Sequence, residues 1–478
     1  MKRIDTLIIH ADLFTMRGQG VGYVEDGCVA IDKGKIIEVG KTADLINEYD
    51  PTELIHAADK MVLPGFIDAH IHTSMSMFRG VAQDTKHWML KGVQPLKYYL
   101  KPESCPEASY VNVLEALASG TTTFGEYASF EHLSQMEVFL DKLGARSNLA
   151  VVVYGWNKQK KAYAVDDLFE LDDNYTRLSL QKNIDLFYKW DKPDSRTTVM
   201  LGIHAPDTLS REMLLECRDA AVKHNMRIHM HVAQGDRETT QMLKRYGKRS
   251  IPFLDELGYL DSRLLAVHLT DATDDEARLV AAKGASMVLC AGSIGICDGI
   301  MPPAHVFQTA GGKVALGSDQ NAGNNCNQII NEMKLTAMYN KIKYRDPAVM
   351  PAWKALRMAT IEGAQAIGLD HRIGSIEKGK CADIIFVDLM TPTMMPVIKK
   401  PFRNHVPNLV YSARGSEVCQ VMVNGRTLYK NGVFTTVDYP YLLHEFKAKS
   451  QRFFEETPWD MEALQTSTGW LLQQNEQL

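Results

Sequence analysis

The amino-acid sequence predicts an α/β fold in which a (β/α)8 barrel fills the middle of the chain and a small β-sandwich domain is built from both chain ends. Two observations support this prediction. The middle of the 478-residue chain consists of short apolar runs that are each followed by a helical stretch, as is typical of β/α units around a buried parallel sheet. Before and after this part, apolar residues alternate with polar ones, as in small antiparallel strands.

The predicted domain organisation follows these changes of pattern. The expected parts are residues 1–60 and 371–440 as the two halves of the β-sandwich, residues 61–370 as the barrel, and residues 441–478 as a mainly helical tail. The strands expected in the first half lie at residues 6–9, 28–31 and 36–39. We expect the two halves to pair in one sheet domain beside the barrel.

Local signals mark individual elements of the barrel. Residues 197–203 form an apolar run that predicts a strand, and Ser210 is expected to cap the helix that follows. A later helix is expected to begin after Thr273, because Glu276 three residues on completes a capping box. The same helix should end before Gly284, where a left-handed cap residue belongs.

Strand character returns near the end of the chain. Residues 382–388 and 418–425 are apolar runs of strand length. The second run ends in Asn424 and Gly425, a pair typical of tight β-hairpins. These runs predict the second half of the β-sandwich.

Composition excludes several classes of partner. The net charge is −5 and the lysines and arginines are dispersed, so we expect no nucleic-acid or anionic-membrane partner. The first residues contain no signal-peptide core, and no apolar run is long enough to span a bilayer. Eight cysteines without a C-x-x-C spacing fit reduced thiols. We therefore expect a cytoplasmic protein.

The strongest chemical signal is the stretch PGFIDAHIH at residues 64–72, an apolar run that ends in His70 and His72. Side chains two positions apart on a strand point to the same side. At the carboxyl end of a barrel strand, the two imidazoles would converge where such barrels carry out chemistry. One H-x-H motif alone is weak evidence, because two strand histidines often bind no metal.

Three later apolar runs end in similar residues. His229 and His231 close one run, His268 closes the next, and Asp319 closes a third. Imidazole and carboxylate are common ligands of Zn²⁺ and Fe²⁺. Four strands that bring such groups to one rim predict a metal site.

These residues lie in motifs that resemble the amidohydrolase superfamily. The resemblance is to its branch of S-adenosylhomocysteine/methylthioadenosine deaminases, guanine deaminases and triazine hydrolases. It spans nearly the whole chain, and the matching motifs are PGFIDAHIH at 64–72, RG at 79–80, GTTT at 120–123, HAPD at 204–207, HVAQ at 231–234, His268, GSD at 317–319 and GSIEKGKCAD at 374–383. It implies a distorted (β/α)8 TIM barrel.

The resemblance also implies a metal site and its chemistry. One divalent metal, Zn²⁺ or alternatively Fe²⁺, would be held by His70, His72, His231 and Asp319. The metal would activate a water as hydroxide. His268 would lie near that water as a catalytic residue, and Asp319 would serve as general base.

Substrate contacts are expected from five further positions. His204 would reach the substrate, and the stretch from Arg79 to Trp88 would form part of the cover of the pocket. Asp207 as a rim carboxylate would favour a cationic or amino-rich substrate, or else is a solvated residue at a helix entry. Glu126 would line the pocket, or else pair with a lysine or arginine.

Gln234 departs from the family pattern, which usually has a glutamate three residues after the metal histidine to shuttle a proton. An amide cannot do so at neutral pH. Three interpretations remain open. Gln234 orients the substrate while Asp236, Glu238 or Asp319 moves the proton; the leaving group needs no acid; or the usual activity is lost.

The predicted function is a metal-dependent aminohydrolase that removes an amino group from a nitrogen heterocycle such as a purine, pteridine, pyrimidine or triazine. The alternatives are a cyclic amidase or a dehalogenating hydrolase with the same site, and a non-catalytic metal- or ligand-binding protein. The expected partner is the small heterocyclic substrate. Members of the family it resembles are often dimers or larger assemblies, but the sequence shows no oligomeric interface.

Overall fold

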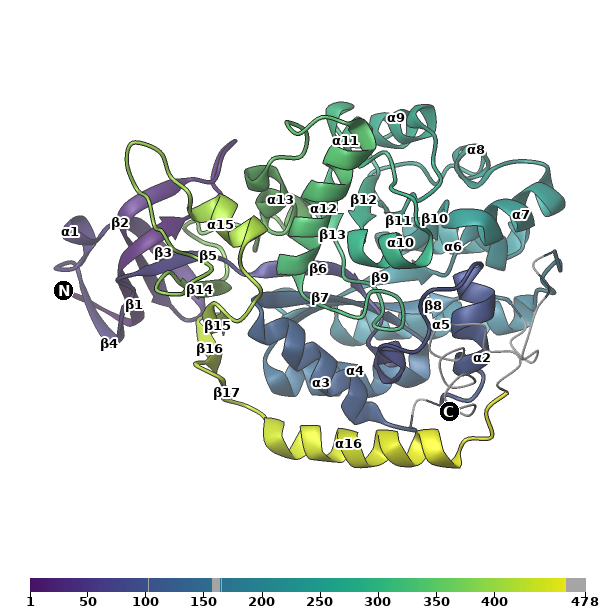
Figure 1. Ribbon diagram of the computed structural model, residues 1–478, viewed down its shortest axis with the longest axis horizontal. Coiled ribbons are helices and arrows are strands. Elements are labelled where there is room, and N and C mark those ends of the chain that lie inside the picture. Colours follow the sequence, from purple (N-terminus) through teal and green to yellow (C-terminus); the bar gives the residue numbers. More distant parts are fainter. Residues whose placement is uncertain (102, 157–163, 165, 461–478) are drawn as a thin grey trace, which may run out of the picture.

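The computed structural model describes residues 1–101, 103–156, 164 and 166–460. The barrel lies at one end of the molecule and a sheet formed by both chain ends lies at the other (Figure 1). A long helix near the carboxyl end runs along the outside of the barrel. The last 18 residues of the predicted helical tail, 461–478, lie outside the described residues.

The barrel is made of eight parallel strands that follow one another in chain order around the sheet. They are β6 (Phe66–Ile71), β7 (Thr121–Ala128), β8 (Arg146–Val153), β9 (Thr197–Ile203), β10 (Ile228–Val232), β11 (Leu264–His268), β12 (Ser286–Leu289) and β13 (Val314–Leu316). The barrel closes just beyond β13, where the backbone N–H of Asp319 donates to the carbonyl oxygen of His70 over 2.9 Å. The predicted (β/α)8 fold is confirmed.

Helices cover the outside of this barrel (Figure 1). They are α3 (Pro106–Ala118), α4 (Phe130–Leu143), α5 (Asp173–Trp190), α6 (Arg211–Lys223), α7 (Gly235–Tyr246), α8 (Ser250–Glu256), α9 (Asp274–Ala282), α10 (Ala291–Cys297), α11 (Ala304–Thr309), α12 (Ile329–Tyr344), α13 (Ala352–Met358) and α14 (Ile361–Ala366). As predicted, Ser210 caps α6 by accepting from the N–H of Met213, and Thr273 forms a capping box with Glu276 at α9. Gly284 follows with a φ of 90°.

The second sheet joins strands from both ends of the chain, as the sequence predicts. Its members are β1 (Lys2–Phe14), β2 (Tyr23–Asp32), β3 (Lys35–Lys41), β4 (Tyr49–His56), β5 (Lys60–Pro64), β14 (Ile384–Asp388), β15 (Val418–Val423), β16 (Arg426–Lys430) and β17 (Val433–Phe434), with the short α1 (Thr42–Leu45) beside them. Antiparallel pairing of β5 with β14 places Val62 opposite Phe386 and links the two ends. Both side chains are buried in one apolar cluster of this sheet. The exact division at residues 60, 370 and 440 stays a proposal.

A buried ion pair ties the end sheet to the barrel. Arg146, the first residue of β8, donates from Nε to the Asp383 carboxylate over 2.7 Å. A second guanidinium nitrogen donates to the side-chain oxygen of Asn424 over 2.6 Å, at the hairpin between β15 and β16. The motif that ends in Asp383 therefore orients the end sheet against the barrel.

Irregular structure covers the mouth of the barrel between β6 and α3. We call residues 73–101 the cover segment; it contains η1 (Thr73–Phe78), the π-helical turn η2 (Met89–Val93) and α2 (Gln94–Lys97). The remaining helices are η3 (Pro206–Thr208), α15 (His405–Tyr411) and α16 (Tyr439–Glu456). α16 lies along α3 (Figure 1) and is fastened to it by Lys449 and Glu107, 2.6 Å apart. Its Phe453 ring also packs against Phe78 of the cover segment.

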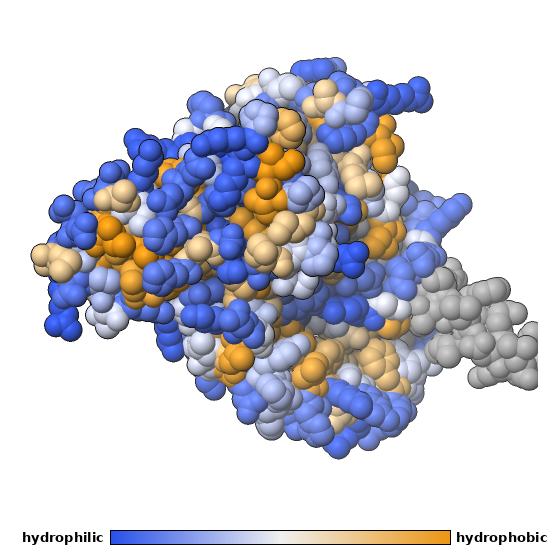
Figure 2. Space-filling model, turned by 60° about the vertical axis from the view of Figure 1, so that its left-hand side comes forward, coloured by the Kyte–Doolittle hydropathy of each residue, from blue (hydrophilic) through white to orange (hydrophobic). Residues whose placement is uncertain are grey.

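No helix within the described residues is long and apolar enough to cross a membrane. Figure 2 shows one face of the molecule on which hydrophilic side chains predominate and hydrophobic ones form separate small patches. All eight cysteines lie within the described residues and are free thiols.

Candidate active site

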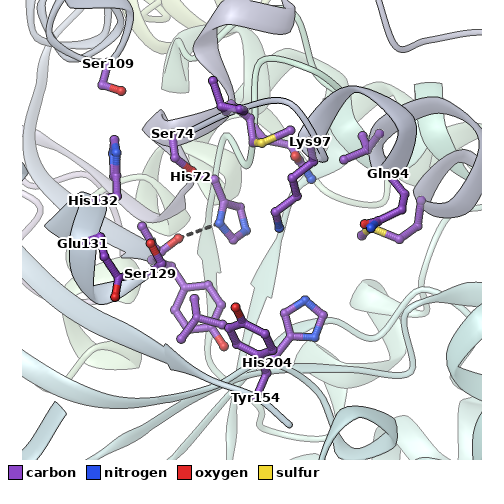
Figure 3. A pocket seen from close by; sticks show the side chains of 18 of the residues that line it. His72, Ser74, Gln94, Lys97, Ser109, Ser129, Glu131, His132, Tyr154 and His204 are labelled. Atoms are coloured by element: carbon purple, nitrogen blue, oxygen red, sulfur yellow. Dashed lines mark hydrogen bonds between the residues drawn. The ribbon is translucent and has the colours of Figure 1, made fainter. Parts of the chain in front are cut away.

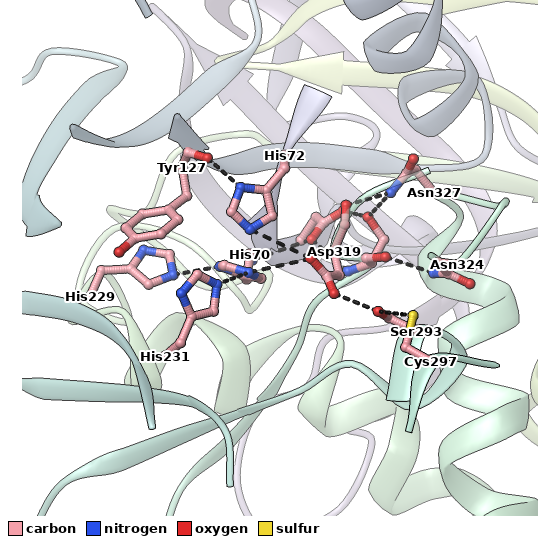
Figure 4. A network of polar contacts seen from close by, with 12 residues as sticks. His70, His72, Tyr127, His229, His231, Ser293, Cys297, Asp319, Asn324 and Asn327 are labelled. Carbon is pink, nitrogen blue, oxygen red and sulfur yellow. Dashed lines mark hydrogen bonds and ion pairs between the residues drawn. The ribbon is translucent and has the colours of Figure 1, made fainter. Parts of the chain in front are cut away.

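Four histidines and one aspartate meet at the carboxyl ends of four barrel strands. We call this group the barrel rim: His70 and His72 at the end of β6, His231 on β10, His268 at the end of β11, and Asp319 after β13. Figure 4 shows His70, His72, His231 and Asp319 close together. The Nε2 atoms of His70 and His231 are 3.3 Å apart. An Asp319 carboxylate oxygen lies 3.6 Å from Nε2 of His70 and 3.5 Å from Nε2 of His72.

Hydrogen bonds on the far side of three imidazole rings fix their orientation. Nδ1 of His72 lies 2.6 Å from the carbonyl oxygen of Tyr127, and Nδ1 of His231 lies 2.5 Å from the carbonyl oxygen of His204. A carbonyl oxygen only accepts, so each Nδ1 carries the proton. Each Nε2 therefore directs its lone pair to the centre of the group, as metal-ligating histidines do.

His229 fixes the orientation of the His70 ring in the same way. Sequence reasoning did not assign this role. Its Nε2 lies 2.8 Å from Nδ1 of His70, and its ring stacks on Tyr127 with centroids 4.6 Å apart. The signal was present in the sequence, because His229 and His231 are two positions apart on β10 and point to the same side of the strand.

Burial keeps these imidazoles neutral. Desolvation lowers the pKa of His72 to about 4 and those of His229 and His268 to about 3. It also lowers the pKa values of His70 and His231 well below the ordinary value. Neutral imidazole is the form that binds a metal ion, so the rim is ready to act as a ligand set near pH 7.

The donor set fits a divalent metal ion. Two groups of rim side chains have ligand atoms within 4.8 Å of one another: His70, His72 and His231, and His70, His268 and Asp319. One oxygen of the buried Asp319 carboxylate accepts from Ser293, while the other has no hydrogen-bond partner among the described residues. Both ring nitrogens of His268 lack such a partner as well. A cation between these atoms would satisfy them.

Two rim residues have backbone conformations that L-residues rarely adopt. The φ angle is 77° at His268 and 59° at Asp319. Such left-handed conformations cost free energy and persist where the surrounding structure requires them, often at functional sites. Here they turn both side chains inward at the point where the strands end.

A cavity of about 380 Å³ opens directly above the rim. Among the residues that line it are His72, His204, His231 and Gln234 from the barrel and Lys97 from the cover segment. Figure 3 shows His72 and His204 facing this space from different strands, with the Lys97 side chain extending towards His72. The cavity volume suits a small-molecule ligand.

Two of the predicted substrate contacts, His204 and Gln234, line this cavity. Gln234 lies directly before α7, and its side-chain oxygen is buried without a hydrogen-bond partner among the described residues. Glu238 accepts from the backbone N–H groups of Ala233 and Gln234. Its carboxylate therefore holds the turn, while Asp236 pairs with His87 outside the cavity. Of the three acids considered as proton carriers, Asp319 alone belongs to the rim.

Arg79 and Trp88 lie in the cover segment, as expected for the stretch between them, but neither is among the residues that line the cavity. Arg79 is exposed and forms an ion pair with Glu115 of α3. Trp88 is buried in an apolar cluster of the cover segment that includes Phe78. The residues that close the cavity come instead from the turns on either side, around Met75 and Met89.

Asp207 and Glu126 also lie outside the cavity lining. Asp207 is fully buried and pairs with Arg237 over 3.5 Å, so it is neither a rim carboxylate nor solvated. Glu126 is buried on β7 and accepts from the backbone and hydroxyl of Thr73. Burial raises the pKa of Glu126 to about 8. It holds the start of the cover segment rather than pairing with a lysine or arginine.

Lys97, Tyr154 and Trp156 line the cavity and were missed by sequence reasoning. Lys97 lies in an irregular segment, where no periodicity tells an inward side chain from an outward one. Tyr154 and Trp156 follow β8 directly. Their position after an apolar run is the same signal that identified the histidines, but aromatic residues there are common in cores.

Comparisons with known proteins agree with this geometry. Residues 61–428 match the model of the Amidohydrolase family. The chain is 32% identical, over 86% of its length and 92% of the relative's, to a 5-methylthioadenosine/S-adenosylhomocysteine deaminase of Moorella thermoacetica. A crystal structure of an adenosine deaminase from Xanthomonas campestris with bound zinc is 26% identical, covers 95% of this chain and 99% of its own, and superposes with a TM-score of 0.85.

A more distant structure shares the fold. The atrazine chlorohydrolase of Arthrobacter aurescens, complexed with zinc, is 21% identical over 93% of this chain and all of its own, with a TM-score of 0.82. The predicted enzyme class, a metal-dependent hydrolase acting on carbon–nitrogen bonds, is confirmed at the level of the family. By its motifs, its fold and the extent of these matches, the chain belongs to the amidohydrolase family.

Proposed function

We propose that this protein is a deaminase that removes an amino group from an aminated nitrogen heterocycle, with an aminopurine as the first candidate. The observation that carries the proposal is the convergence of His70, His72, His231 and Asp319 beneath a cavity of about 380 Å³. The relatives named as 5-methylthioadenosine/S-adenosylhomocysteine deaminases support a purine substrate.

We assign these four residues as ligands of one metal ion, and zinc as the metal, since a related adenosine deaminase structure contains zinc. When bound, the metal supplies a hydroxide nucleophile at neutral pH and acts as a Lewis acid. Asp319 holds its carboxylate at the centre of the rim through Ser293, where it can accept a proton from the attacking water. His268 faces the same point, where it stabilises developing charge.

Gln234 orients the substrate in this scheme. Its buried side-chain oxygen has no hydrogen-bond partner among the described residues, so an N–H group of a heterocycle would satisfy it. Apolar side chains such as Met77, Val152 and Trp156 form walls of the cavity, as a planar ring requires. Proton delivery to the leaving amine then falls to Asp319, which is the acid of the rim.

An ammonia-release screen tests the proposal. Protein loaded with zinc or with iron(II) is incubated with aminated purines, pteridines, pyrimidines and triazines, and ammonia is measured enzymatically. Release from at least one class, abolished in Asp319→Asn, is expected. No ammonia from any class, in a sample shown to hold one metal per chain, would contradict it.

A dehalogenating hydrolase is the second candidate, and Gln234 is the observation that favours it. An amide at this point of the cavity cannot protonate a leaving group, whereas a halide needs no acid. The same screen extended to chlorinated heterocycles separates the two, because this reaction would release chloride in place of ammonia.

A further inference from the structure

The cavity contains a lysine that the proposed reaction does not use. Lys97 ends α2 in the cover segment and extends into the cavity towards His72 (Figure 3). Its side chain is partly buried. Within residues 1–101, 103–156, 164 and 166–460, no carboxylate lies within ion-pair distance of its ammonium group.

The other charged groups of the cavity do not balance this cation. Lys101 also lines the cavity, and the described residues give it no acid partner either. The carboxylate that lines the cavity, Glu131, is already paired with Lys182 over 3.3 Å. The wall formed by the cover segment is therefore positive.

Placing an ammonium group there has a cost. Burial, and secondarily the nearby charge of Arg237, lower the pKa of Lys97. Arg237 itself is compensated by Asp207. A partly desolvated cation without a partner is unfavourable unless a ligand supplies the opposite charge. A carboxylate or phosphate on the substrate would do so, and hydrogen bonds between charged partners are strong.

We propose that Lys97 selects substrates that carry an anionic substituent, a carboxylate or a phosphate, on the heterocycle or on a short arm attached to it. This inference rests on the proposed function and narrows its substrate class. Lys101, at the mouth of the same wall, would attract the anionic group on entry. Lys97 thus acts as a specificity-determining residue and takes no part in the bond cleavage.

Matched pairs of compounds test the proposal. The pairs are adenosine with its phosphate monoester, and an aminopteridine with its carboxylate. Affinity is measured by titration calorimetry and turnover by ammonia release, on metal-loaded wild type, Lys97→Met, Lys97→Arg and the control Lys91→Met. Lys91 lies in the same segment but does not line the cavity.

We expect wild type and Lys91→Met to bind the anionic member of at least one pair about 10-fold or more tightly than the neutral member. Lys97→Met should lose that preference, chiefly through a rise in Kd and KM for the anionic member, and Lys97→Arg should keep most of it. The pair that shows the preference distinguishes a phosphate from a carboxylate.

Two results would overturn the inference: wild type binds neutral members as tightly as anionic ones, or the preference survives Lys97→Met. Failure of the proposed function is a separate outcome. In that case the anionic members still bind in a Lys97-dependent manner, but no compound releases ammonia.

Discussion

The barrel rim and the cover segment lie on opposite sides of one cavity but are built in different ways. On the rim, His70, His231 and His268 lie on or at the end of buried parallel strands, and the rings of His70 and His231 are each held by a partner behind them. The cover segment consists of short helical turns joined by irregular backbone. Its Lys97 reaches the cavity without an acid partner among the described residues.

This difference separates chemistry from recognition. Backbone pairing in a closed barrel holds ligand atoms in place before any metal or substrate binds, and such preorganisation lowers the cost of binding. A loop segment tolerates substitution without loss of the barrel, so it can change the substrate. We therefore expect substitutions of the residues that hold the rim side chains to affect folding and metal binding. Substitutions in the cover segment should change substrate selectivity or have no effect.

The largest expected effect on stability comes from Asp207, whose buried carboxylate pairs with Arg237 of α7. Asp207→Asn should lower the free energy of unfolding by about 3 kcal/mol or more, because it leaves the buried Arg237 without a counter-charge. Chemical denaturation measures this change, with the exposed Asp219→Asn as control. Selectivity between charged and neutral substrates should stay unchanged. A stable variant with altered selectivity would return Asp207 to the substrate site.

His229→Phe tests the support behind a rim ligand. The phenyl ring keeps the stacking on Tyr127 but removes the contact with Nδ1 of His70. We expect metal affinity to fall about 10- to 100-fold, the usual effect of losing such a partner, as measured by competition with a chromogenic chelator. Tyr127→Phe is the matched control, because its hydroxyl has no partner among the described residues. Equal affinities in the two variants would contradict the assigned role.

Glu126 connects the two regions, and its protonation should appear in the pH dependence of stability. Burial raises its pKa in the folded protein to about 8, above the ordinary value of about 4.3 for an unfolded chain. The folded state then binds the extra proton, so this contribution is present at low pH and is lost as pH rises towards 8. Thermal unfolding from pH 5 to 9 should show a shallower decline in Glu126→Gln than in wild type. Parallel curves would show that Glu126 is ionised.

Arg79→Ala should have the smallest effect. Arg79 is exposed and pairs with Glu115 on the outer side of the cover segment, and exposed ion pairs contribute less than about 1 kcal/mol. Steady-state kinetics should show kcat/KM within about twofold of wild type. A tenfold loss of kcat/KM would correspond to about 1.4 kcal/mol of transition-state stabilisation. A larger loss would mean that Arg79 reaches the substrate after all.

The sequence predicted the barrel and the position of the rim because both depend on regular structure. Once the apolar run that ends in His70 and His72 is a barrel strand, the positions of both side chains at its carboxyl end are determined. Asp319 lies beside them because the barrel closes between β13 and β6. The cover segment lacks such periodicity. The family resemblance placed Arg79 and Trp88 in the cover of the pocket, whereas Lys97 lies on the short α2 that follows a π-helical turn.

The side-chain pairs that surround the site were harder to predict than the site residues themselves. Asp207 was interpreted either as a rim carboxylate or as a solvated residue, but its buried side chain pairs with Arg237 of α7. Pairing between residues of different β/α units depends on how the helices pack, which one sequence does not reveal. The roles of the rim residues as ligands remain a prediction until a metal is located.

Anomalous diffraction from crystals of the zinc-loaded protein, recorded at the zinc absorption edge, tests the central claim most directly. We predict one peak per chain, about 2.0–2.1 Å from Nε2 of His70, His72 and His231 and at a similar distance from an Asp319 oxygen. No peak at the rim, or a peak ligated elsewhere, would contradict the assignment of the barrel rim as the metal centre.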